Sequence, residues 1–321
     1  MSSGTVLVTG ATGFVGAHLV RHLVGLDNDV HLLCRPGSDT TRLADLQEAV
    51  TMHLADIREP DLVGAVVTAA EPDRVFHLAA ATTHGGQPPT ADDQVTTNLR
   101  GTVALMDACR DRTLDAFVNI GDALEYGPGN GPIAETAMCR PTSLDGITKL
   151  AATLYGSALA GSAGLPIVTV RPFSIVGVDD NPRRLVPRLV DSARAGAPMA
   201  LSDRRIMRDF VWVHDAIDLF LRAADRATEL PGQVLNCGSG VATTLEELVA
   251  AVERVAGVTV DAGWGAFPVA PHDLEHTVAD ITMATRALGW RPTTSLDEIV
   301  EHLWISRGPG QTQGAGLEPS P

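Results

Sequence analysis

Three glycines near the start of the chain constrain its fold more than any other feature. Residues 9–16 read TGATGFVG, directly after a short β-rich run and at the start of an amphipathic helical pattern. Gly10 would permit a tight turn, Gly13 would let the backbone approach a pyrophosphate, and Gly16 would let the helix pack closely on the strand. The helix amino terminus would then offer unpaired N–H groups and a positive dipole end to the phosphates. The pattern therefore predicts a dinucleotide-binding strand–turn–helix.

Short apolar runs alternate with amphipathic helical patterns over the first two-thirds of the chain. The expected strands cover about 6–8, 30–33, 50–53, 75–78, 117–120 and 167–170. The expected helices between them cover about 14–24, 61–70, 92–112 and 143–160. Continuous apolar strands separated by helices are typical of a parallel sheet that is covered on both faces. We therefore expect an α/β fold with a doubly wound parallel Rossmann sheet.

The pattern changes after about residue 177, where proline and arginine become frequent and the apolar runs shorten. Helical patterns remain at about 213–227, 244–256 and 296–305. We expect a dinucleotide-binding Rossmann domain over 1–177 and a smaller C-terminal lobe, mainly substrate-binding, over 178–307. Some segments of this lobe are expected to return to the sheet. The stretch 308–321, rich in Gly, Pro and Gln, is expected to be a disordered tail.

Composition and charge exclude several classes of partner. A formal net charge of −15 argues against a nucleic-acid partner and against attraction to an anionic membrane. No apolar run is long enough to span a bilayer, and no signal-like segment precedes the first strand. The 4 cysteines show no C-x-x-C spacing, which favours reduced thiols over a disulfide framework or a zinc site. We expect a cytoplasmic protein with no membrane partner and no bound metal.

The end of the second expected strand bears on the choice of dinucleotide. An acidic residue there usually holds the ribose hydroxyls of NAD. Residues 33–38 contain no carboxylate and instead carry Arg35 and Ser38. A guanidinium can pair with a 2′-phosphate, and a hydroxyl can add a hydrogen bond. The segment favours NADP(H) over NAD(H), with a solvated loop cation as the alternative interpretation of Arg35.

Beyond the glycine turn, short motifs follow one another in the order of a known family. They are TGATGFVG at 9–16, DI at 56–57, HLAA at 77–80, NLRGT at 98–102, YG at 126–127, RPF at 171–173, RDFV at 208–211 and NCGSG at 236–240. On these motifs the chain resembles the extended short-chain dehydrogenases/reductases over about residues 5–305. The resemblance is specifically to their NAD-dependent epimerase/dehydratase group, which modifies nucleotide sugars.

The resemblance implies where both ligands would lie. Asp56 and Ile57 would lie against the adenine, and Arg208 would contact the diphosphate of a nucleotide sugar, with help from Arg183 and Arg184. Together with the glycine turn and the second strand, the expected cofactor-binding residues are Gly10, Thr12, Gly13, Phe14, Val15, Gly16, Arg35, Ser38, Asp56, Ile57, Leu78, Ala79, Ala80, Lys149 and Pro172. The expected substrate-binding residues are Thr82, His84, Ser174, Arg183 and Arg208.

The catalytic positions depart from the pattern of the family, whose members use a Ser or Thr together with a Tyr and a Lys in a Y-x-x-x-K spacing. Lys149 matches the lysine, but Asp145 stands at the tyrosine position and Asp122 at the Ser/Thr position. Tyr126, on the loop that leaves the fifth strand, is a further candidate acid, with loop packing as its alternative role. The candidate catalytic residues are therefore Lys149, Asp145, Asp122 and Tyr126.

The protonation of the two aspartates decides whether they can act as acids. On a helix, Asp145 and Lys149 share a face at i, i+4, and the ammonium should lower the pKa of Asp145. Asp145 would then be ionised and poor at donating a proton near neutral pH. Asp122 could reverse this, because two close carboxylates can share a proton, which raises one pKa.

Three functions are compatible with these residues. The first is an NADP(H)-dependent oxidoreductase, a ketoreductase that acts on a nucleotide-linked keto sugar with non-standard acid/base residues. The second is a nucleotide-sugar epimerase or isomerase that retains NAD(P). The third is a non-catalytic protein that binds NADP and a nucleotide sugar. The resemblance also suggests a homodimer formed through two long helices that flank the sheet.

Overall fold

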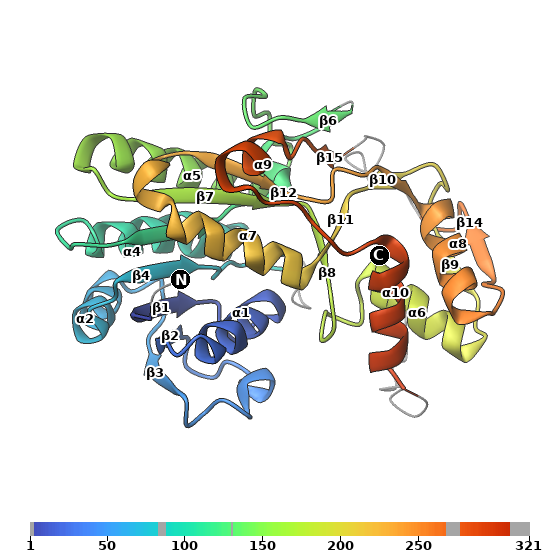
Figure 1. The fold of residues 1–321 in the computed structure, drawn as a ribbon, viewed down its shortest axis with the longest axis horizontal. Coiled ribbons are helices and arrows are strands. Elements are labelled where there is room, and N and C mark those ends of the chain that lie inside the picture. Colours follow the sequence, from blue (N-terminus) through green and yellow to red (C-terminus); the bar gives the residue numbers. More distant parts are fainter. Residues whose placement is uncertain (1–2, 83–87, 130, 268–276, 309–321) are drawn as a thin grey trace.

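The computed structural model describes residues 3–82, 88–129, 131–267 and 277–308, which form one large parallel sheet and a smaller lobe (Figure 1). The strands of the sheet are β1 (Thr5–Thr9), β2 (Asp29–Cys34), β3 (Val50–Leu54), β4 (Arg74–His77), β5 (Ala116–Ile120), β7 (Ile167–Pro172) and β12 (Val234–Cys237). Their order is β12-β7-β5-β4-β1-β2-β3, and every pairing is parallel. The expected doubly wound Rossmann sheet is confirmed.

Alternating side chains of the strands explain why helices cover both faces of the sheet. In β1, Val6 and Val8 join a buried apolar cluster with residues of α1 and α7, whereas Leu7 joins a second cluster with residues of α2, α4 and α5. Successive side chains of a strand point to opposite faces, so an unbroken apolar strand requires cover on both. The helices that provide it are α1 (Phe14–Gly25), α2 (Pro60–Ala70), α4 (Thr102–Ala108), α5 (Leu144–Ala163) and α7 (Val213–Asp225).

The helix expected over 92–112 takes a different form. The chain forms α3 (Ala91–Gln94), a π-helical stretch at Val95–Gly101 and then α4, which ends at Ala108. The expected long helix is therefore present, but it contains a π-helical stretch and ends at Ala108 rather than at about residue 112. π-Helical turns re-aim side chains and are frequent at functional sites, and this one carries Asn98.

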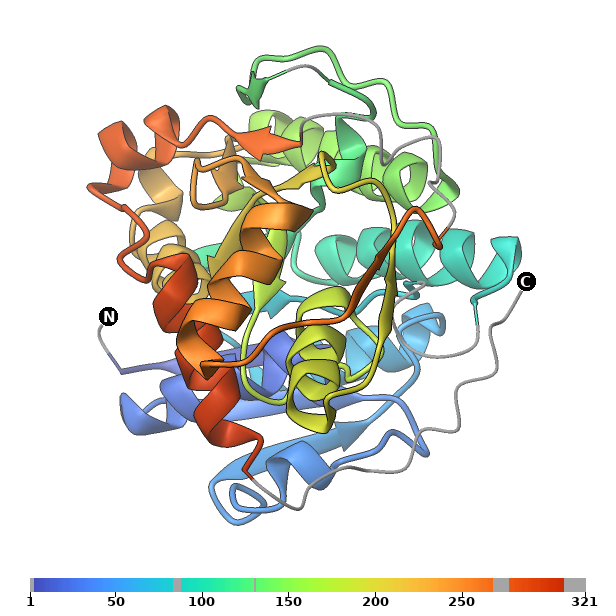
Figure 2. The same cartoon turned by 90° about the vertical axis from the view of Figure 1, so that its right-hand side faces the viewer.

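The smaller lobe is drawn on the right in Figure 1 and faces the viewer in Figure 2. Its helices are α6 (Leu185–Ala195), α8 (Leu245–Ala256) and α10 (Leu296–Ser306), and α8 packs against both of the others. Short paired strands complete it or join it to the sheet: β8 (Ser174–Val176) with β11 (Phe210–Trp212), β9 (Met199–Leu201) with β14 (Ala262–Trp264), β10 (Met207–Arg208) with β13 (Thr243–Thr244), and β6 (Pro132–Ile133) with β15 (Val278–Ala279). α9 (Thr282–Leu288) packs against β12 and α7.

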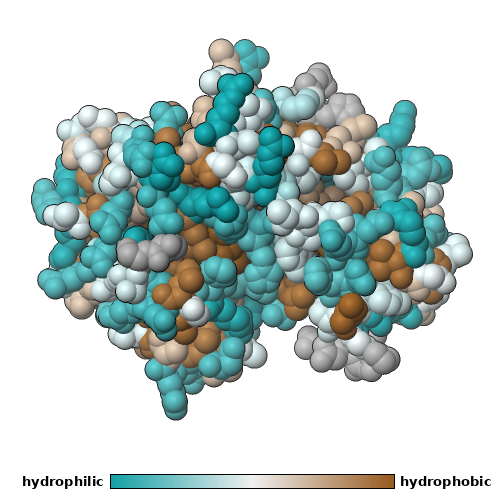
Figure 3. Space-filling view, in the orientation of Figure 1, coloured by the Kyte–Doolittle hydropathy of each residue, from teal (hydrophilic) through white to brown (hydrophobic). Residues whose placement is uncertain are grey.

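Within the described ranges, no helix combines the length and the apolar composition that a membrane span needs. The face shown in Figure 3 is mostly hydrophilic, with apolar residues dispersed over it and a hollow at the lower edge between the two parts of the molecule. Among the same described residues, no three His, Cys, Asp or Glu side chains are grouped so as to hold a metal ion.

Candidate active site

The glycine turn between β1 and α1 leaves space and donors for an anion. Gly10 adopts a φ of +70°, and a Cβ there would lie 2.6 Å from the backbone nitrogen of Ala79. A Cβ at Gly16 would clash with the carbonyl group of Gly10. α1 begins after Gly13 with neither a side-chain cap nor an acidic residue in its first turn. Its first N–H groups therefore meet no side-chain acceptor, which is the arrangement that binds phosphate at a helix amino terminus.

Other expected cofactor residues border the same turn. The backbone N–H of Leu78 donates to the carbonyl of Thr9 over 3.1 Å, and that of Ala79 donates to the Thr9 hydroxyl over 3.2 Å. These contacts place the segment after β4 beside the end of β1, which is the carboxyl edge of the sheet. The partly exposed residues at this edge are Thr12, Phe14, Val15, Leu78, Ala79, Ala80 and Pro172.

The loop after β2 presents a cation rather than a carboxylate. Arg35 is exposed, and the N–H of Ser38 donates to its carbonyl over 3.0 Å in a turn. Asp56, at the end of the neighbouring strand, is bound by Arg58, whose Nη2 lies 2.7 Å from Oδ2. This contact lowers the pKa of Asp56, and the charge of Arg35 lowers it further. Arg35 is therefore close to Asp56, while the adjacent Ile57 is buried.

Lys149 links α5 to the end of β5. Its Nζ donates to the carbonyl of Ile120 over 2.7 Å, and the residue is 8% exposed. Asp122 lies two residues beyond this carbonyl, where its carboxylate accepts from the N–H of Leu124 over 2.8 Å. Lys149 and Asp122 therefore meet at the same end of the sheet.

Asp122 and Asp145 are brought together, although they belong to different elements. Desolvation raises the pKa of Asp122 to about 7, and the negative charge of Asp145 adds to the rise. The N–H of Leu124 and the charge of Lys149 act in the opposite direction but are outweighed. Asp122 is partly exposed, whereas Asp145 is 4% exposed.

The expected direction of the pKa shift of Asp145 needs correction. Desolvation raises the pKa of Asp145, and the opposing effect of Lys149 is smaller. The i, i+4 spacing places the two groups on one helix face, but the sequence could not reveal how far burial would penalise the carboxylate. Asp145 also lies 3.4 Å from the side-chain amide nitrogen of Asn98.

Tyr126 is not placed as an accessible acid. It is 3% exposed, and its hydroxyl donates to Oδ1 of Asn236 over 2.7 Å. Burial raises the pKa of Tyr126 to about 12, and the guanidinium of Arg171 stacks on its ring at 4.4 Å. Arg171 is itself paired with the fully buried Glu125 at 2.8 Å. The geometry therefore favours the packing role of Tyr126 over the catalytic one.

A buried chain of hydrogen bonds joins the glycine turn to Asp145. His77 contacts the hydroxyl of Thr9 through Nδ1 at 2.6 Å and that of Thr102 through Nε2 at 2.7 Å. The Thr102 hydroxyl donates to the carbonyl of Asn98, so Nε2 of His77 carries the proton. Burial lowers the pKa of His77 to about 3, and it stays neutral at physiological pH. The motifs TGATGFVG, HLAA and NLRGT contain these residues, but the sequence alone does not pair them.

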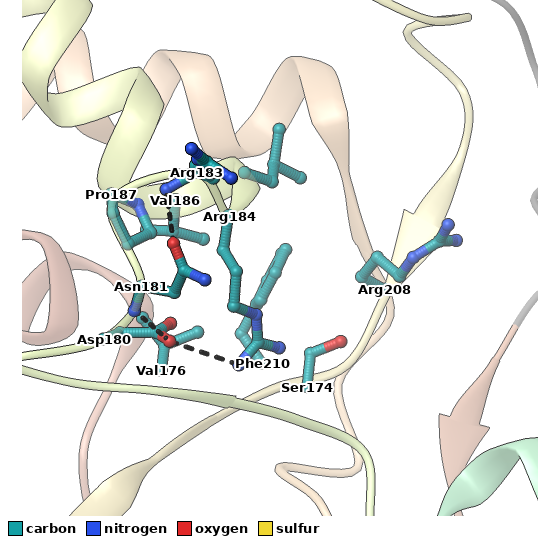
Figure 4. A pocket seen from close by; sticks show the side chains of 11 residues that line it. Ser174, Val176, Asp180, Asn181, Arg183, Arg184, Val186, Pro187, Arg208 and Phe210 are labelled. Carbon is teal, nitrogen blue, oxygen red and sulfur yellow. Dashed lines mark hydrogen bonds and ion pairs between the residues drawn. The ribbon is translucent and has the colours of Figure 1, made fainter. Parts of the chain in front are cut away.

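A cavity of about 320 Å³ between β8, β11 and α6 gathers three arginines (Figure 4). Arg208 lies on one side of it, and Arg183 and Arg184 lie on the other. Arg184 is oriented by the buried carboxylate of Asp180 at 3.3 Å. Ser174, which was also expected to bind substrate, lines the same cavity. The positive charge here suits an anionic group in an otherwise acidic protein.

A second cavity of about 210 Å³ adjoins the first, because Leu185 and Arg208 line both. Its other walls include Met199, Leu201 and Phe267. Apolar walls beside a cationic group suit a ligand with a flat ring next to a phosphate. These apolar residues could not be recognised from the sequence as ligand-binding, because each resembles an ordinary core position.

Two expected substrate residues are not assigned a contact. Thr82 is partly exposed after the segment that follows β4. His84 lies outside the described residues.

Comparisons with known proteins agree with this arrangement. The model of the NAD dependent epimerase/dehydratase family matches residues 6–238. A UDP-glucose 4-epimerase of Streptomyces lividans is 30% identical over 319 residues, which cover 94% of this chain and 95% of that protein. The structure of UDP-glucuronic acid 4-epimerase from Bacillus cereus, in complex with UDP-glucuronic acid and NAD, is 26% identical with a TM-score of 0.81 and covers 94% of this chain and 98% of that one. A UDP-glucose-4-epimerase from Stenotrophomonas maltophila, with bound NAD and formylated UDP-arabinopyranose, is 25% identical with a TM-score of 0.85 over 95% of this chain and 98% of its own.

Proposed function

Because the chain belongs to the NAD-dependent epimerase/dehydratase family, we propose that it is a nucleotide-sugar epimerase that retains its dinucleotide. This is the second of the three functions expected from the sequence. Relatives named as 4-epimerases match nearly the whole chain, which supports the epimerase over the ketoreductase. The observation that carries the proposal is the pair of carboxyl groups, Asp122 and Asp145, beside Lys149.

Asp122 has the properties that an epimerase requires of its acid/base group. An epimerase must remove a proton from a sugar hydroxyl and return it in the same cycle, whereas a reductase only donates one. A group with a pKa near the working pH does both efficiently, and the pKa of Asp122 is raised to about 7. Asp122 is also the more exposed member of the pair, so it is the one that a substrate would meet.

In the proposed reaction, the bound dinucleotide would transfer the hydride and residues of the chain would transfer the proton. Bound dinucleotide would supply a nicotinamide that accepts a hydride and gives it back. The carboxylate of Asp122 would take the proton of the sugar hydroxyl as that carbon is oxidised to a carbonyl. Asp122 would give the proton back to the same oxygen when the carbonyl is reduced. Lys149 would hold the ribose. Its positive charge limits the rise in the pKa of both carboxyl groups.

The two adjoining cavities would hold the nucleoside diphosphate part of the substrate, which does not react. The three arginines suit the diphosphate, and the apolar cavity around Met199 and Leu201 suits the base. Such a tether, far from the reacting carbon, lets a keto intermediate turn without leaving the site.

We also infer that the dinucleotide is NADP(H) and that the chain forms a homodimer. The exposed Arg35 beside Asp56 supports a 2′-phosphate partner. Ile147 and Leu154 of α5 are 49% and 61% exposed and lie two helical turns apart on one face, which supports a second copy as their cover. Leu154→Asp should convert a dimer into a monomer in sedimentation analysis. A cytoplasmic location stays a prediction.

The test of the proposed function uses the purified protein without added cofactor. The protein is denatured to release and identify any bound dinucleotide, and native protein is incubated with UDP-glucose or UDP-glucuronic acid while NMR monitors the sugar ring protons. We expect stoichiometric dinucleotide and slow appearance of an epimer. Net consumption of NADPH with a keto sugar, and no epimer, would support the ketoreductase instead. Binding of dinucleotide and UDP without any product from a panel of UDP-sugars would support the non-catalytic protein.

A further inference from the structure

The loop that carries two arginines of the first cavity is held by residues from the dinucleotide side of the molecule. This loop, residues 177–184, joins β8 to α6. Nε2 of His18 in α1 lies 2.8 Å from the carbonyl oxygen of Val178. The guanidinium of Arg42 donates to the carbonyl of Asp179 through Nε at 3.3 Å and Nη2 at 3.2 Å. We call His18 and Arg42 the loop clamp.

The loop needs such contacts because its backbone is not relaxed. Asp179 has a φ of +66°, a conformation that residues other than glycine rarely adopt. It occupies the third position of a tight turn in which the N–H of Asp180 donates to the carbonyl of Gly177 over 3.3 Å. The clamp accordingly binds the two carbonyl groups that lie inside this turn, those of Val178 and Asp179.

The turn determines where the arginines lie. Asp180, which closes the turn, is 4% exposed and accepts from Nη1 of Arg184 over 3.3 Å and from the N–H of Asn181 over 2.7 Å. Oδ1 of Asn181 in turn accepts from the N–H of Arg183 over 2.9 Å. A change in the turn would therefore move both arginines of the cavity.

Each member of the clamp is also close to a group that would hold the dinucleotide. His18 follows Phe14 by one helical turn in α1, and the two rings contact edge to face with centroids 5.5 Å apart. Phe14 lies at the amino terminus of α1, beside the glycine turn. Arg42 lies a few residues after Arg35 and Ser38, and its own carbonyl is bound by Arg21. The clamp thus relates two parts of the expected dinucleotide site, the glycine turn and the loop after β2, to one loop of the substrate cavity.

We propose that His18 and Arg42 are positioning residues that couple the two ligand sites, so that bound dinucleotide tightens the binding of a nucleoside diphosphate. Dinucleotide would order the first turn of α1 and the loop after β2, and the clamp would transmit that order to residues 177–184. Coupling of this kind is reciprocal, and nucleoside diphosphate would tighten the binding of dinucleotide by the same factor. This inference rests on the proposed function, because it requires that the arginine cavity bind a diphosphate.

The experiment measures the affinity for UDP by calorimetry, with protein saturated with dinucleotide and with protein freed of dinucleotide by reversible denaturation and refolded. The variants are Arg42→Leu and His18→Leu, and their conservative counterparts Arg42→Lys and His18→Gln keep a donor. Arg226→Leu is the matched control, because Arg226 pairs with Glu229 on the surface at the end of α7. Circular dichroism and thermal melting identify a variant that fails to fold. If one leucine variant fails to fold, the coupling is tested with its conservative counterpart and with the variants of the other clamp residue.

For the native protein we expect UDP to bind about 10-fold more tightly when dinucleotide is present. In Arg42→Leu and His18→Leu this ratio should fall to less than about 2-fold, while the conservative variants and Arg226→Leu keep most of it. An unchanged ratio in both leucine variants would overturn the coupling and leave the proposed function intact. Failure of the native protein to bind UDP in either state would overturn both.

Discussion

Asp145 lies close enough to Asp122 for its negative charge to raise the pKa of Asp122, which burial has already increased. The two residues come from different elements, one in α5 and the other just after β5. Burial, with a smaller contribution from Asp145, raises the pKa of Asp122 to about 7, where an ordinary aspartate would be fully ionised. The predictions below follow from this pair and from the residues around it.

Asp122→Asn should remove the acid/base group with little change in shape, since an amide oxygen can still accept from the N–H of Leu124. We expect kcat/KM for epimerisation to fall by about 10²- to 10⁴-fold. In the native protein the ionised carboxylate starts the cycle, so kcat/KM should rise through a pH of about 7. That rise should be absent in the variant. A variant that keeps near-native activity and the same pH profile would exclude Asp122 as the acid/base group.

Asp145→Asn should shift the pH profile rather than abolish activity. Removing the negative charge removes one cause of the raised pKa of Asp122, so the pKa of Asp122 falls. The rise in kcat/KM should then occur at lower pH than in the native protein. A shift to higher pH, or no shift with activity retained, would mean that the two carboxyl groups are not coupled.

Tyr126→Phe separates the packing role of this residue from a catalytic one. The change leaves Oδ1 of Asn236 without its donor, which should cost about 1–2 kcal/mol of unfolding free energy. Epimerisation should remain within about 3-fold of native, because Asp122 is untouched. Chemical denaturation and steady-state rates test both expectations. A loss of activity as large as that of Asp122→Asn would assign proton transfer to the phenol instead.

Arg35→Leu tests the choice of dinucleotide. If the guanidinium binds a 2′-phosphate, the affinity for NADP⁺ should fall by about 10- to 100-fold, a typical cost for a charge-assisted contact. The affinity for NAD⁺, which lacks that phosphate, should change less than about 2-fold. An equal loss of affinity for both dinucleotides would show that Arg35 supports the loop and does not bind the 2′-phosphate.

The parallel sheet and its glycine turn could be predicted because their causes are local. Apolar runs such as Val6–Val8 and the glycines of the following turn each act over a few residues, and the structure agrees with both. The cation at Arg35 and the motif around Arg208 were visible for the same reason. Both were read from neighbouring positions in the chain.

Features that depend on distant partners could not be predicted. Tyr126 finds its acceptor 110 residues away at Asn236, and nothing near it in the sequence reveals that contact. The raised pKa of Asp145 reflects desolvation by several elements, which its spacing from Lys149 does not report. The π-helical stretch around Asn98 likewise depends on packing, because its sequence is also compatible with a regular helix.

The most direct test of the central claim is the absorbance of the reduced nicotinamide while native protein, holding its own dinucleotide, is mixed with UDP-glucose or UDP-glucuronic acid. An epimerase with Asp122 as its acid/base group should show a transient rise in reduced dinucleotide that decays as the epimer forms, and Asp122→Asn should reduce the rate of that rise. No rise from bound oxidised dinucleotide, together with steady oxidation of added NADPH by a keto sugar, would contradict the account.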